Sequence, residues 1–305
     1  MIPMRQIGRY RLDEVEGFGA FATVWRGFDL ELEIPVAVKV LAENWAHHAD
    51  VRERFLAEAR LLRRLHDPRV VRVHDVGTHD DRPFFVMDFV PGGTLAGRVK
   101  PPVSTERALQ LAIDSARAVQ VLHEAGVLHR DIKPSNLLVG DAEQVLVADL
   151  GSAKRLAEAS GVTVTTGTPA YMAPEQARGN PIDARSDVYS LGAVAYELLA
   201  GHPPYDVGDP GSLLSRTVDS RPAPLAVSRG LPRTLDHVLA SALATRPQDR
   251  PASAEAFADA LEHVVAGSRV HNLTRVRREV APALAITLAL LVFGLSAALT
   301  WWALR

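Results

Sequence analysis

Hydrophobic and polar residues along the first 90 residues predict strands around one helix. The runs YRLDEV, TVWRGFD and IPVAVKVL are rich in β-branched and aromatic residues, which favour strands. Residues 50–66 then place apolar side chains at intervals of three and four, the spacing of one helix face. The runs VVRVHDVG and PFFVMDF read as two further strands. We expect a small β-sheet that ends near residue 90.

The pattern changes to helical spacing after VPGGTL, in which a proline and paired glycines favour a hinge. From Ser104 onward the chain is expected to be mainly helical. The predicted helices span residues 104–125, 187–200, 232–244 and 253–265. The two patterns predict a β-rich lobe at residues 1–90 and a helical lobe at residues 91–265.

The C-terminal stretch has no polar face. Residues 280–304 carry no charge, and as a helix of about 1.5 Å per residue they would exceed the roughly 30 Å hydrocarbon core of a bilayer. Trp301 and Trp302 lie near one end, as aromatic residues at membrane interfaces do. We predict a single transmembrane helix at residues 280–304, after a basic linker at residues 266–279. A buried C-terminal core helix is the alternative.

Positive charge around this segment predicts its orientation. Arg275, Arg277 and Arg278 precede it, whereas Arg305 alone follows it. Cationic residues favour the cytoplasmic side of a membrane. We therefore expect a single-pass protein of the cell membrane whose working part is cytoplasmic. The N-terminus has no apolar stretch, so no signal peptide is expected.

The composition argues against nucleic-acid binding and against sites built from cysteine. The net charge of −2 argues against a nucleic-acid partner, because nucleic-acid binders usually carry a strong basic excess. The chain has no cysteine, which excludes disulfides and thiolate metal sites. A hydrophobic fraction of 47% allows a substantial core.

A glycine-containing turn follows the first predicted strand. Gly17 and Gly19 are two residues apart, and Ala22 stands where a third glycine would complete G-x-G-x-x-G. A dinucleotide-binding fingerprint requires strand, turn and helix, whereas strand, turn and strand are expected here. If this segment binds phosphates, it does so as a flap between two antiparallel strands.

Two charged residues interrupt the apolar patterns. Lys39 ends VAVK within a predicted strand. Glu58 shares a helix face with Phe55 and Leu62. A buried charge requires a partner. The alternatives are a lysine that reaches solvent at a strand end and a glutamate at a helix edge.

The strongest motif is HRDIKPSN, which contains Asp131, Lys133 and Asn136 between a long helix and a strand. ADLG, with Asp149, ends another β-rich run, and GTPAYMAPE and SDVYSLG follow. In this order, over residues 9–265, the blocks resemble the eukaryotic-like (Hanks-type) bacterial serine/threonine protein kinases. The resemblance implies an α+β bilobal kinase fold, with a small β-rich N-lobe and a larger helical C-lobe, to which the predicted transmembrane helix is added.

The resemblance also implies roles for the charged residues. Lys39 would hold the α- and β-phosphates of ATP, and Glu58 would orient Lys39, so that each is the other's partner. Asp149 and Asn136 would bind Mg²⁺, which prefers such oxygen ligands. Mn²⁺ is the alternative metal.

The catalytic loop would complete the transfer of a phosphoryl group. Asp131 would accept or orient the proton of the attacking hydroxyl, and Lys133 would lie near the γ-phosphate. A lysine at this position resembles serine/threonine kinases rather than tyrosine kinases. Thr168 would brace Asp131 and the substrate loop.

Nucleotide contacts follow from the same resemblance. Met87 would be the gatekeeper before the hinge, and Asp88 to Val90 would face adenine through backbone groups. The expected nucleotide-binding residues are Gly17, Gly19, Val24, Ala37, Lys39, Met87, Asp88 and Val90. The chain departs from the family pattern at Ala22, which restricts the flap backbone, and at Leu150, which replaces the more frequent phenylalanine.

Other matches imply scaffold contacts and a switch. Glu175 would pair with Arg250, and Asp187 would cap the backbone of the catalytic loop. Arg130 directly precedes Asp131, where an arginine in this family commonly pairs with a phosphate on the activation loop. The candidate phosphorylation sites are Thr163, Thr165 and Thr166, which a transient homodimer would modify in trans. The alternative is an unmodified, solvated loop.

The sequence thus predicts a membrane-anchored serine/threonine protein kinase that uses ATP and acts on protein substrates. An ATP-binding pseudokinase and a membrane adaptor scaffold are the alternatives. Lys39, Asp131 and Asp149 are the residues that pseudokinases usually lose, and all three are present.

Overall fold

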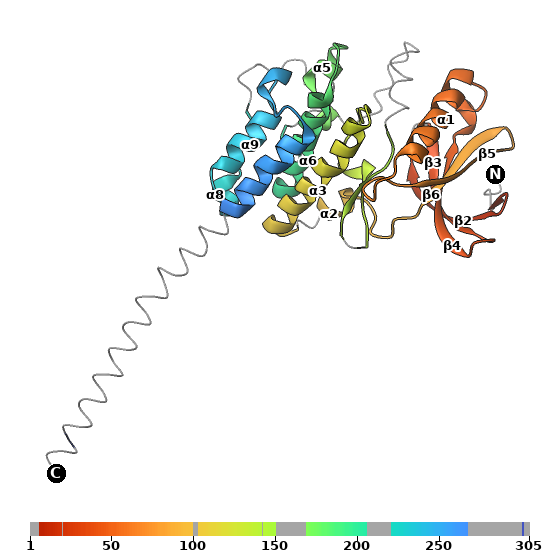
Figure 1. Ribbon diagram of the computed structural model, residues 1–305, viewed down its shortest axis with the longest axis horizontal. Helices are drawn as coiled ribbons and strands as arrows, with labels where there is room; N and C mark the ends of the chain where they lie inside the picture. Colours follow the sequence, from red (N-terminus) through yellow and green to blue (C-terminus); the bar gives the residue numbers. More distant parts are fainter. Residues whose placement is uncertain are drawn as a thin grey trace.

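The computed structural model describes residues 6–19, 21–99, 103–141, 143–150, 169–205, 221–267 and 301, and these form two lobes (Figure 1). A twisted sheet with one long helix beside it makes the smaller, N-terminal lobe. Helices make most of the larger, C-terminal lobe. The bilobal fold expected from the sequence is therefore present.

The N-terminal lobe is built on one six-stranded sheet. Its strands are β1 (Gln6–Ile7), β2 (Tyr10–Phe18), β3 (Ala22–Asp29), β4 (Ile34–Leu41), β5 (Val73–His79) and β6 (Arg82–Asp88). Their order across the sheet is β1-β2-β3-β4-β6-β5, and every neighbouring pair is antiparallel. The β-branched and aromatic runs of the sequence supply these strands.

Strand β4 shows how alternation assigns the two faces of this sheet. Val36, Val38 and Val40 pack in one hydrophobic cluster, whereas Ala37 belongs to the larger cluster that continues into the C-terminal lobe. Side chains alternate along a strand, so Lys39 shares the face of Ala37. The spacing in IPVAVKVL therefore directs the lysine toward the main core.

Helix α1 (Ala49–Arg64) covers this face and contacts β5 and β6. Phe55, Glu58 and Leu62 are buried on one side of the helix, as the spacing predicts. The ring of Phe55 lies 5.0 Å from that of Phe85, measured between centroids. Phe85 is the cross-strand partner of Lys39, so this packing brings α1 to the lysine.

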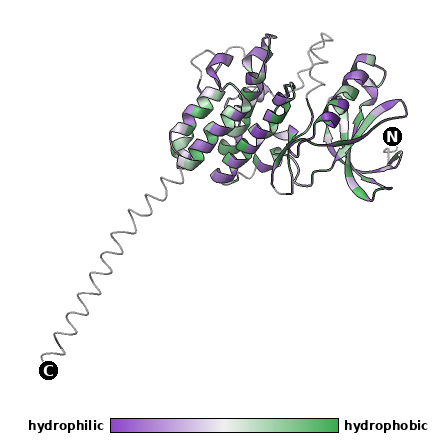
Figure 2. Cartoon of the chain, in the orientation of Figure 1, coloured by the Kyte–Doolittle hydropathy of each residue, from purple (hydrophilic) through white to green (hydrophobic). Residues whose placement is uncertain are grey.

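Helices form most of the C-terminal lobe. They are α2 (Ala96–Val99), α3 (Thr105–Glu124), α5 (Pro174–Ala177), α6 (Ala184–Ala200), α8 (Ala226–Arg229) and α9 (Thr234–Ala242), followed by a helix at residues 254–267. Short 3-10 turns lie at η1 (Glu43–Trp45), η2 (Pro134–Asn136), η3 (Pro169–Tyr171) and η4 (Pro247–Asp249). Helix α6 packs on α3 and is buried along nearly its whole length, as suits a helix with apolar residues on most sides (Figure 2).

A hairpin lies where the two lobes meet. It consists of β7 (Leu137–Val139) and β8 (Val145–Val147). Val147 bridges to Val70, which follows α1. The hinge segment also pairs with it, since the N–H of Val139 donates to the carbonyl of Gly93 at 2.9 Å. The N-terminal lobe and the hinge therefore both contact the hairpin that follows the catalytic loop at residues 129–136.

Gly92 is required where the hinge crosses this hairpin. A Cβ atom on Gly92 would lie 2.0 Å from the carbonyl oxygen of Val139, far inside van der Waals contact. The paired glycines of VPGGTL thus allow a close backbone approach, and Gly93 also adopts a left-handed conformation at φ +69°.

Some predicted elements have shifted ends. The helix expected from residue 187 begins at Ala184, because Asp183 is its N-cap and accepts a hydrogen bond from the N–H of Arg185 at 2.8 Å. The strand expected from residue 70 begins at Val73. The short elements β1, α2, α5 and α8 were not predicted, since a few residues carry too little periodic signal.

The glycine turn also differs from the expectation. Gly17 lies within β2 and pairs with Val24, so it belongs to the strand and not to the turn. The turn follows it, closed by a hydrogen bond of 2.8 Å from the N–H of Gly19 to the carbonyl of Ala22.

The predicted transmembrane helix at residues 280–304 lies outside the described residues, apart from Trp301. Among the residues that are described, no helix combines the length and the apolar character needed to cross a bilayer.

Candidate active site

Lys39 lies between two carboxylates. Its Nζ atom is 2.8 Å from Oε1 of Glu58 and 3.0 Å from Oδ1 of Asp149. Strand β4, helix α1 and the segment after β8 each supply one of these side chains. The contact expected between Lys39 and Glu58 is therefore present, and Asp149 joins it.

The charges of this cluster do not balance, because one ammonium faces two carboxylates. Burial disfavours the charged form of Lys39, but Asp149 and Glu58 outweigh it and raise the lysine pKa. Burial raises the pKa of Glu58 to about 7 against the opposing effect of Lys39. The surrounding protein desolvates the inner side of the partly exposed Asp149 carboxylate, which would raise its pKa, but Lys39 holds that pKa below its ordinary value. Asp149 is therefore the carboxylate of the cluster that is held ionised, as a ligand for a cation must be.

The catalytic loop holds Asp131 by two neighbouring side chains. Oδ2 of Asp131 lies 2.9 Å from Nζ of Lys133 and accepts a hydrogen bond of 3.1 Å from Nδ2 of Asn136. The same Nδ2 donates to the backbone carbonyl of Asp131 at 2.8 Å. Three of the predicted site residues thus form one hydrogen-bonded group.

The β7–β8 hairpin places Asn136 and Asp149 at one end. Leu137 pairs with Val147, and the N–H of Ala148 donates to the carbonyl of Asn136 at 3.2 Å. Asn136 and Asp149, the predicted metal ligands, therefore both lie beside the Leu137–Val147 pair at the end of the hairpin.

These two side chains fit Mg²⁺. Nδ2 of Asn136 donates to Asp131, so the ligand atom would be the amide oxygen, which also accepts a long hydrogen bond of 3.4 Å from Oγ of Ser135. The side chain of Asp149 is 42% exposed, in contrast to 9% for Lys39. Carboxylate and amide oxygens are the hard ligands that Mg²⁺ takes, with phosphate and water oxygens completing its shell. Within the described residues, no three His, Cys, Asp or Glu residues form a metal site by themselves.

Asp187 fixes the backbone that precedes Asp131. Its Oδ2 accepts from the N–H of His129 at 2.9 Å, and its Oδ1 from the N–H of Arg130 at 2.8 Å. Arg130 is held at φ 68°, a left-handed conformation that costs a non-glycine residue about 1–2 kcal/mol. The predicted cap on the catalytic loop is thus present, and it stabilises a strained residue.

The expected nucleotide-binding residues come from adjacent strands. Val24 on β3 is the cross-strand partner of Lys39 on β4, and Ala37 on β4 is that of Met87 on β6. Met87 is buried at the end of the sheet, and the hinge begins at Asp88. Strand pairing therefore brings Val24 and Met87, which are far apart in the sequence, onto the strands on either side of β4, which carries Lys39.

The two departures from the family pattern both fill apolar space. The Ala22 side chain is buried in the main hydrophobic cluster, while its carbonyl closes the glycine turn. Leu150 is buried in the same cluster directly after Asp149.

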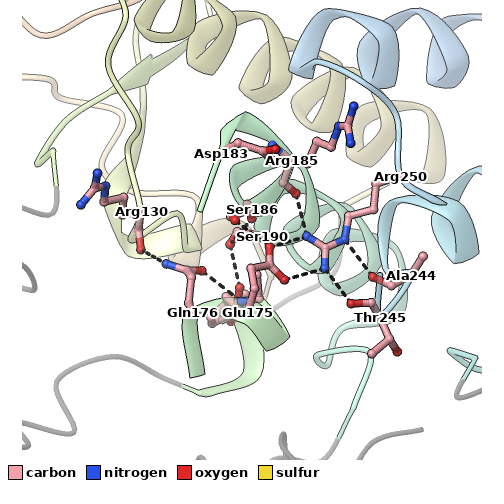
Figure 3. A network of polar contacts seen from close by, with 12 residues as sticks. Arg130, Glu175, Gln176, Asp183, Arg185, Ser186, Ser190, Ala244, Thr245 and Arg250 are labelled. Atoms are coloured by element: carbon pink, nitrogen blue, oxygen red, sulfur yellow. Dashed lines mark hydrogen bonds and ion pairs between the residues drawn. The ribbon is translucent and has the colours of Figure 1, made fainter. Parts of the chain in front are cut away.

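A network below the catalytic loop joins Glu175 to Arg250 (Figure 3). Nη1 and Nη2 of Arg250 lie 2.6 and 2.8 Å from Oε1 and Oε2 of Glu175, in the predicted pairing. Ser186 donates to Oε1 of Glu175 at 2.6 Å. Burial raises the pKa of Glu175, but the hydrogen bonds from Arg250 and Ser186 outweigh it and lower that pKa below its ordinary value.

Three polar contacts near the site were not predicted. His123 donates through Nε2 to Oδ2 of Asp187 at 2.8 Å. Tyr171 donates a short hydrogen bond to Oε2 of Glu197. Gln176 bonds to the backbone of the catalytic loop. Gln176 follows APE directly in the sequence, and the first two contacts link distant residues that no spacing pattern connects.

Several expected residues lie outside the described part of the chain. These are the candidate phosphorylation sites Thr163, Thr165 and Thr166, and the proposed brace Thr168. Arg130 is described, and its guanidinium points away from the network around Gln176 (Figure 3).

Comparison with known proteins agrees with this geometry. The model of the protein kinase domain matches residues 10–264. The chain belongs to the protein kinase family. Members of this family use ATP and Mg²⁺. The oxygen atoms of Asp149 and Asn136 would accommodate the Mg²⁺ ion.

Curated relatives are serine/threonine-protein kinases of Mycobacterium tuberculosis. PknB is 39% identical over 283 residues, which cover 88% of this chain and 44% of PknB. PknL is 38% identical over 264 residues, which cover 84% of this chain and 65% of PknL. The chain therefore matches less than half the length of PknB.

A crystal structure of the Mycobacterium tuberculosis PknI kinase domain is similar in fold. It superimposes with a TM-score of 0.65 at 30% sequence identity, covering 85% of this chain and 97% of that domain.

Proposed function

We propose that the chain is a serine/threonine protein kinase that transfers the γ-phosphate of ATP to protein hydroxyl groups. The observation that carries the proposal is Lys39 held between Glu58 and Asp149 at 2.8 and 3.0 Å. This cluster joins a fixed ammonium for phosphate to a carboxylate for metal, the combination that phosphoryl transfer needs. The names of PknB and PknL support the choice of serine and threonine.

The residues would act by positioning and by neutralising charge. Lys39 would hold phosphate oxygens, and Asp149 and Asn136 would hold Mg²⁺, which when bound would supply positive charge beside the phosphates. The substrate hydroxyl oxygen forms a bond to the γ-phosphorus while the bond from that phosphorus to the bridging oxygen of ADP breaks. Asp131 takes the hydroxyl proton, and Lys133 balances charge beside it.

The alternatives are less well supported. A pseudokinase usually lacks the lysine, the catalytic aspartate or the metal aspartate, whereas Lys39, Asp131 and Asp149 are all present and their side chains are engaged. An adaptor role is compatible with catalysis and has no separate observation in its favour.

Phosphate transfer from labelled ATP to serine- and threonine-containing proteins tests the proposal, with Mg²⁺ and with Mn²⁺. We expect transfer by the full chain in detergent and severe loss in Asp131→Asn. Equal transfer by the wild-type and Asp131→Asn proteins would contradict it, because the label would then come from a contaminating kinase or from another mechanism.

We also propose that residues 280–304 anchor the kinase in the cell membrane, with the kinase domain in the cytoplasm. The uncharged run and the arginines before it support this. The full chain should sediment with membranes and resist extraction by alkaline carbonate, whereas a chain that ends at residue 279 should be released. Release of the full chain by carbonate alone would exclude a spanning helix.

We further propose autophosphorylation in trans, within a transient homodimer, at Thr163, Thr165 or Thr166. A phosphate there adds nearly two negative charges and forms charge-assisted hydrogen bonds to arginine. Arg130 directly precedes Asp131, and its guanidinium points away from the Gln176 network, which supports its role as that partner (Figure 3). Mass spectrometry should find phosphate on this segment in the wild type and not in Asp131→Asn. Full activity of the triple alanine variant would place the switch elsewhere.

A further inference from the structure

Gln176 joins two loops of the active site through one side-chain amide. Its Nε2 atom donates to the backbone carbonyl of Arg130 at 2.9 Å, and its Oε1 atom accepts from the N–H of Ala173 at 3.1 Å (Figure 3). Ala173 ends the loop that contains η3, and Arg130 immediately precedes Asp131. Gln176, Asp131 and Lys133 also line one small cavity.

The bond to Arg130 constrains the peptide group that carries Asp131. The carbonyl of Arg130 and the N–H of Asp131 belong to one planar peptide unit. Gln176 holds the carbonyl, and Nδ1 of His129 accepts from the N–H at 3.4 Å. A planar group held at both ends cannot rotate freely, so the direction in which Asp131 leaves the backbone is fixed.

The strained conformation of Arg130 makes this restraint important. Asp187 holds the N–H of Arg130 at 2.8 Å, and Gln176 holds its carbonyl, so the residue at φ 68° is clamped on both sides. A left-handed non-glycine residue relaxes unless the surrounding structure holds it. Asp187 restrains the peptide group between His129 and Arg130, and Gln176 restrains the one between Arg130 and Asp131.

We propose that Gln176 is a positioning residue for phosphoryl transfer, which couples the loop ending at Ala173 to the orientation of Asp131. The inference rests on the proposed kinase function. The hydrogen bonds of Gln176 go to Ala173 and Arg130, neither of which is an expected nucleotide-binding residue, so Gln176 would act through the Arg130–Asp131 peptide. Its loss therefore lowers kcat and leaves ATP affinity unchanged.

Only an amide of this length makes both bonds. A glutamate keeps the acceptor for the N–H of Ala173 but cannot donate to the carbonyl of Arg130 when ionised. A leucine of similar volume makes neither bond. Gln176→Glu therefore removes the link to the catalytic loop alone, and Gln176→Leu removes both links without adding charge.

The experiment compares the full-length wild type, Gln176→Glu and Gln176→Leu in a steady-state peptide kinase assay. Rates are divided by the concentration of nucleotide-binding sites, measured with a fluorescent ATP analogue, so that unfolded protein does not count. Gln144→Glu, in the exposed turn between β7 and β8, is the control for the added charge. Asp131→Asn measures the background.

We expect kcat per binding site to fall about tenfold in both Gln176 variants, the effect of about one hydrogen bond in the transition state. The dissociation constant of the ATP analogue should stay within about twofold of the wild type, and Gln144→Glu should match the wild type. The inference would be overturned if the Gln176 variants kept the wild-type kcat per site, including the case in which they only have fewer binding sites. It would also be overturned if their affinity for the ATP analogue fell in proportion to kcat. If the wild type shows no Asp131-dependent transfer, the proposed kinase function fails as well. If the wild type is active and the Gln176 variants are equally active, only the role of Gln176 is refuted.

Discussion

Arg250 and Glu175 form a two-pronged ion pair between residues 75 positions apart in the sequence. Both prongs are buried, with Nη1 to Oε1 at 2.6 Å and Nη2 to Oε2 at 2.8 Å. Arg250 also donates through Nε to the carbonyl of Ala244 at 2.8 Å and through Nη1 to that of Arg185 at 2.9 Å. The guanidinium thus joins α5, the start of α6 and the segment after α9.

Removal of Arg250 should strongly destabilise the C-terminal lobe. Arg250→Met leaves the carboxylate of Glu175 buried without its counter-charge, for which we expect a loss of about 3–5 kcal/mol in the free energy of unfolding. Urea denaturation followed by circular dichroism measures it. Arg246→Met is the matched control, because its ion pair with Asp249 is solvent-exposed and should contribute about 0–1 kcal/mol. Equal losses in the two variants would contradict the assignment.

Acid should weaken this ion pair in a defined pH range. The pKa of Glu175 is lowered from its ordinary value of 4.5, so the unfolded chain takes up the proton before the folded chain does. The stability from this group is present above pH 4.5 and is lost as the pH falls through the lower, folded-state pKa. The difference in unfolding free energy between the wild type and Glu175→Gln should therefore shrink below pH 4.5 in urea titrations. A difference that is constant or larger in acid would show that Glu175 is not held ionised.

Loss of the charge on Glu58 should impair phosphate binding by Lys39. In Glu58→Gln the ammonium keeps Asp149 as its only carboxylate in the cluster, at 3.0 Å, and is drawn toward the metal ligand. We expect kcat/KM to fall about tenfold or more, as for other changes that remove charge positioning. Steady-state kinetics at varied ATP measures it. Glu53→Gln, on the exposed side of the same helix, should match the wild type; equal activity of Glu58→Gln and the wild type would refute the role.

Asp187→Asn should disturb the catalytic loop. The aspartate accepts from the N–H groups of His129 and Arg130 and from Nε2 of His123, and an asparagine turns an NH₂ group toward one of these donors. We expect a stability loss of about 1–3 kcal/mol together with a lower kcat. Thermal denaturation and kinase assays measure both. Asp183→Asn, at the N-cap of the same helix, should change neither greatly because asparagine is also a good N-cap.

Gly92→Ala should displace the hinge from β7. The added methyl group would lie 2.0 Å from the carbonyl oxygen of Val139, so the backbone of one segment has to move. We expect a loss of about 1–3 kcal/mol in unfolding free energy, the usual effect of overpacking, and weaker binding of ATP. Gly97→Ala, in α2, meets no atom within 4 Å and should be neutral or slightly stabilising. A normal thermal midpoint for Gly92→Ala would contradict the close approach.

Local patterns in the sequence were sufficient to predict the main elements. The β-branched run IPVAVKVL predicts strand β4, and helical spacing predicts α1 with Glu58 on its apolar face, although the burial of Lys39 and Glu58 was left open. Such signals are local, because side-chain direction repeats every two residues in a strand and every 3.6 in a helix. The ends of elements were less predictable. Capping residues such as Asp183 set where a helix begins, and similar residues also occur in turns. Pairings that follow known motifs, such as Glu175 with Arg250, came from resemblance and not from periodicity.

The contacts that orient the catalytic loop depend on the tertiary structure. Gln176 reaches the carbonyl of Arg130 across 46 positions, and His123 reaches Asp187 across 64. No periodicity connects such pairs, because their distance depends on how α3, α5 and α6 pack around the loop. The same holds for Gly92, whose contact with Val139 exists only after the hinge and the β7–β8 hairpin meet. The sequence by itself determined the main helices and strands and, through its resemblance to protein kinases, indicated which residues would carry the chemistry. The packing of the lobes decided how the backbone of those residues is held, since close packing sets distances that spacing along the chain does not contain.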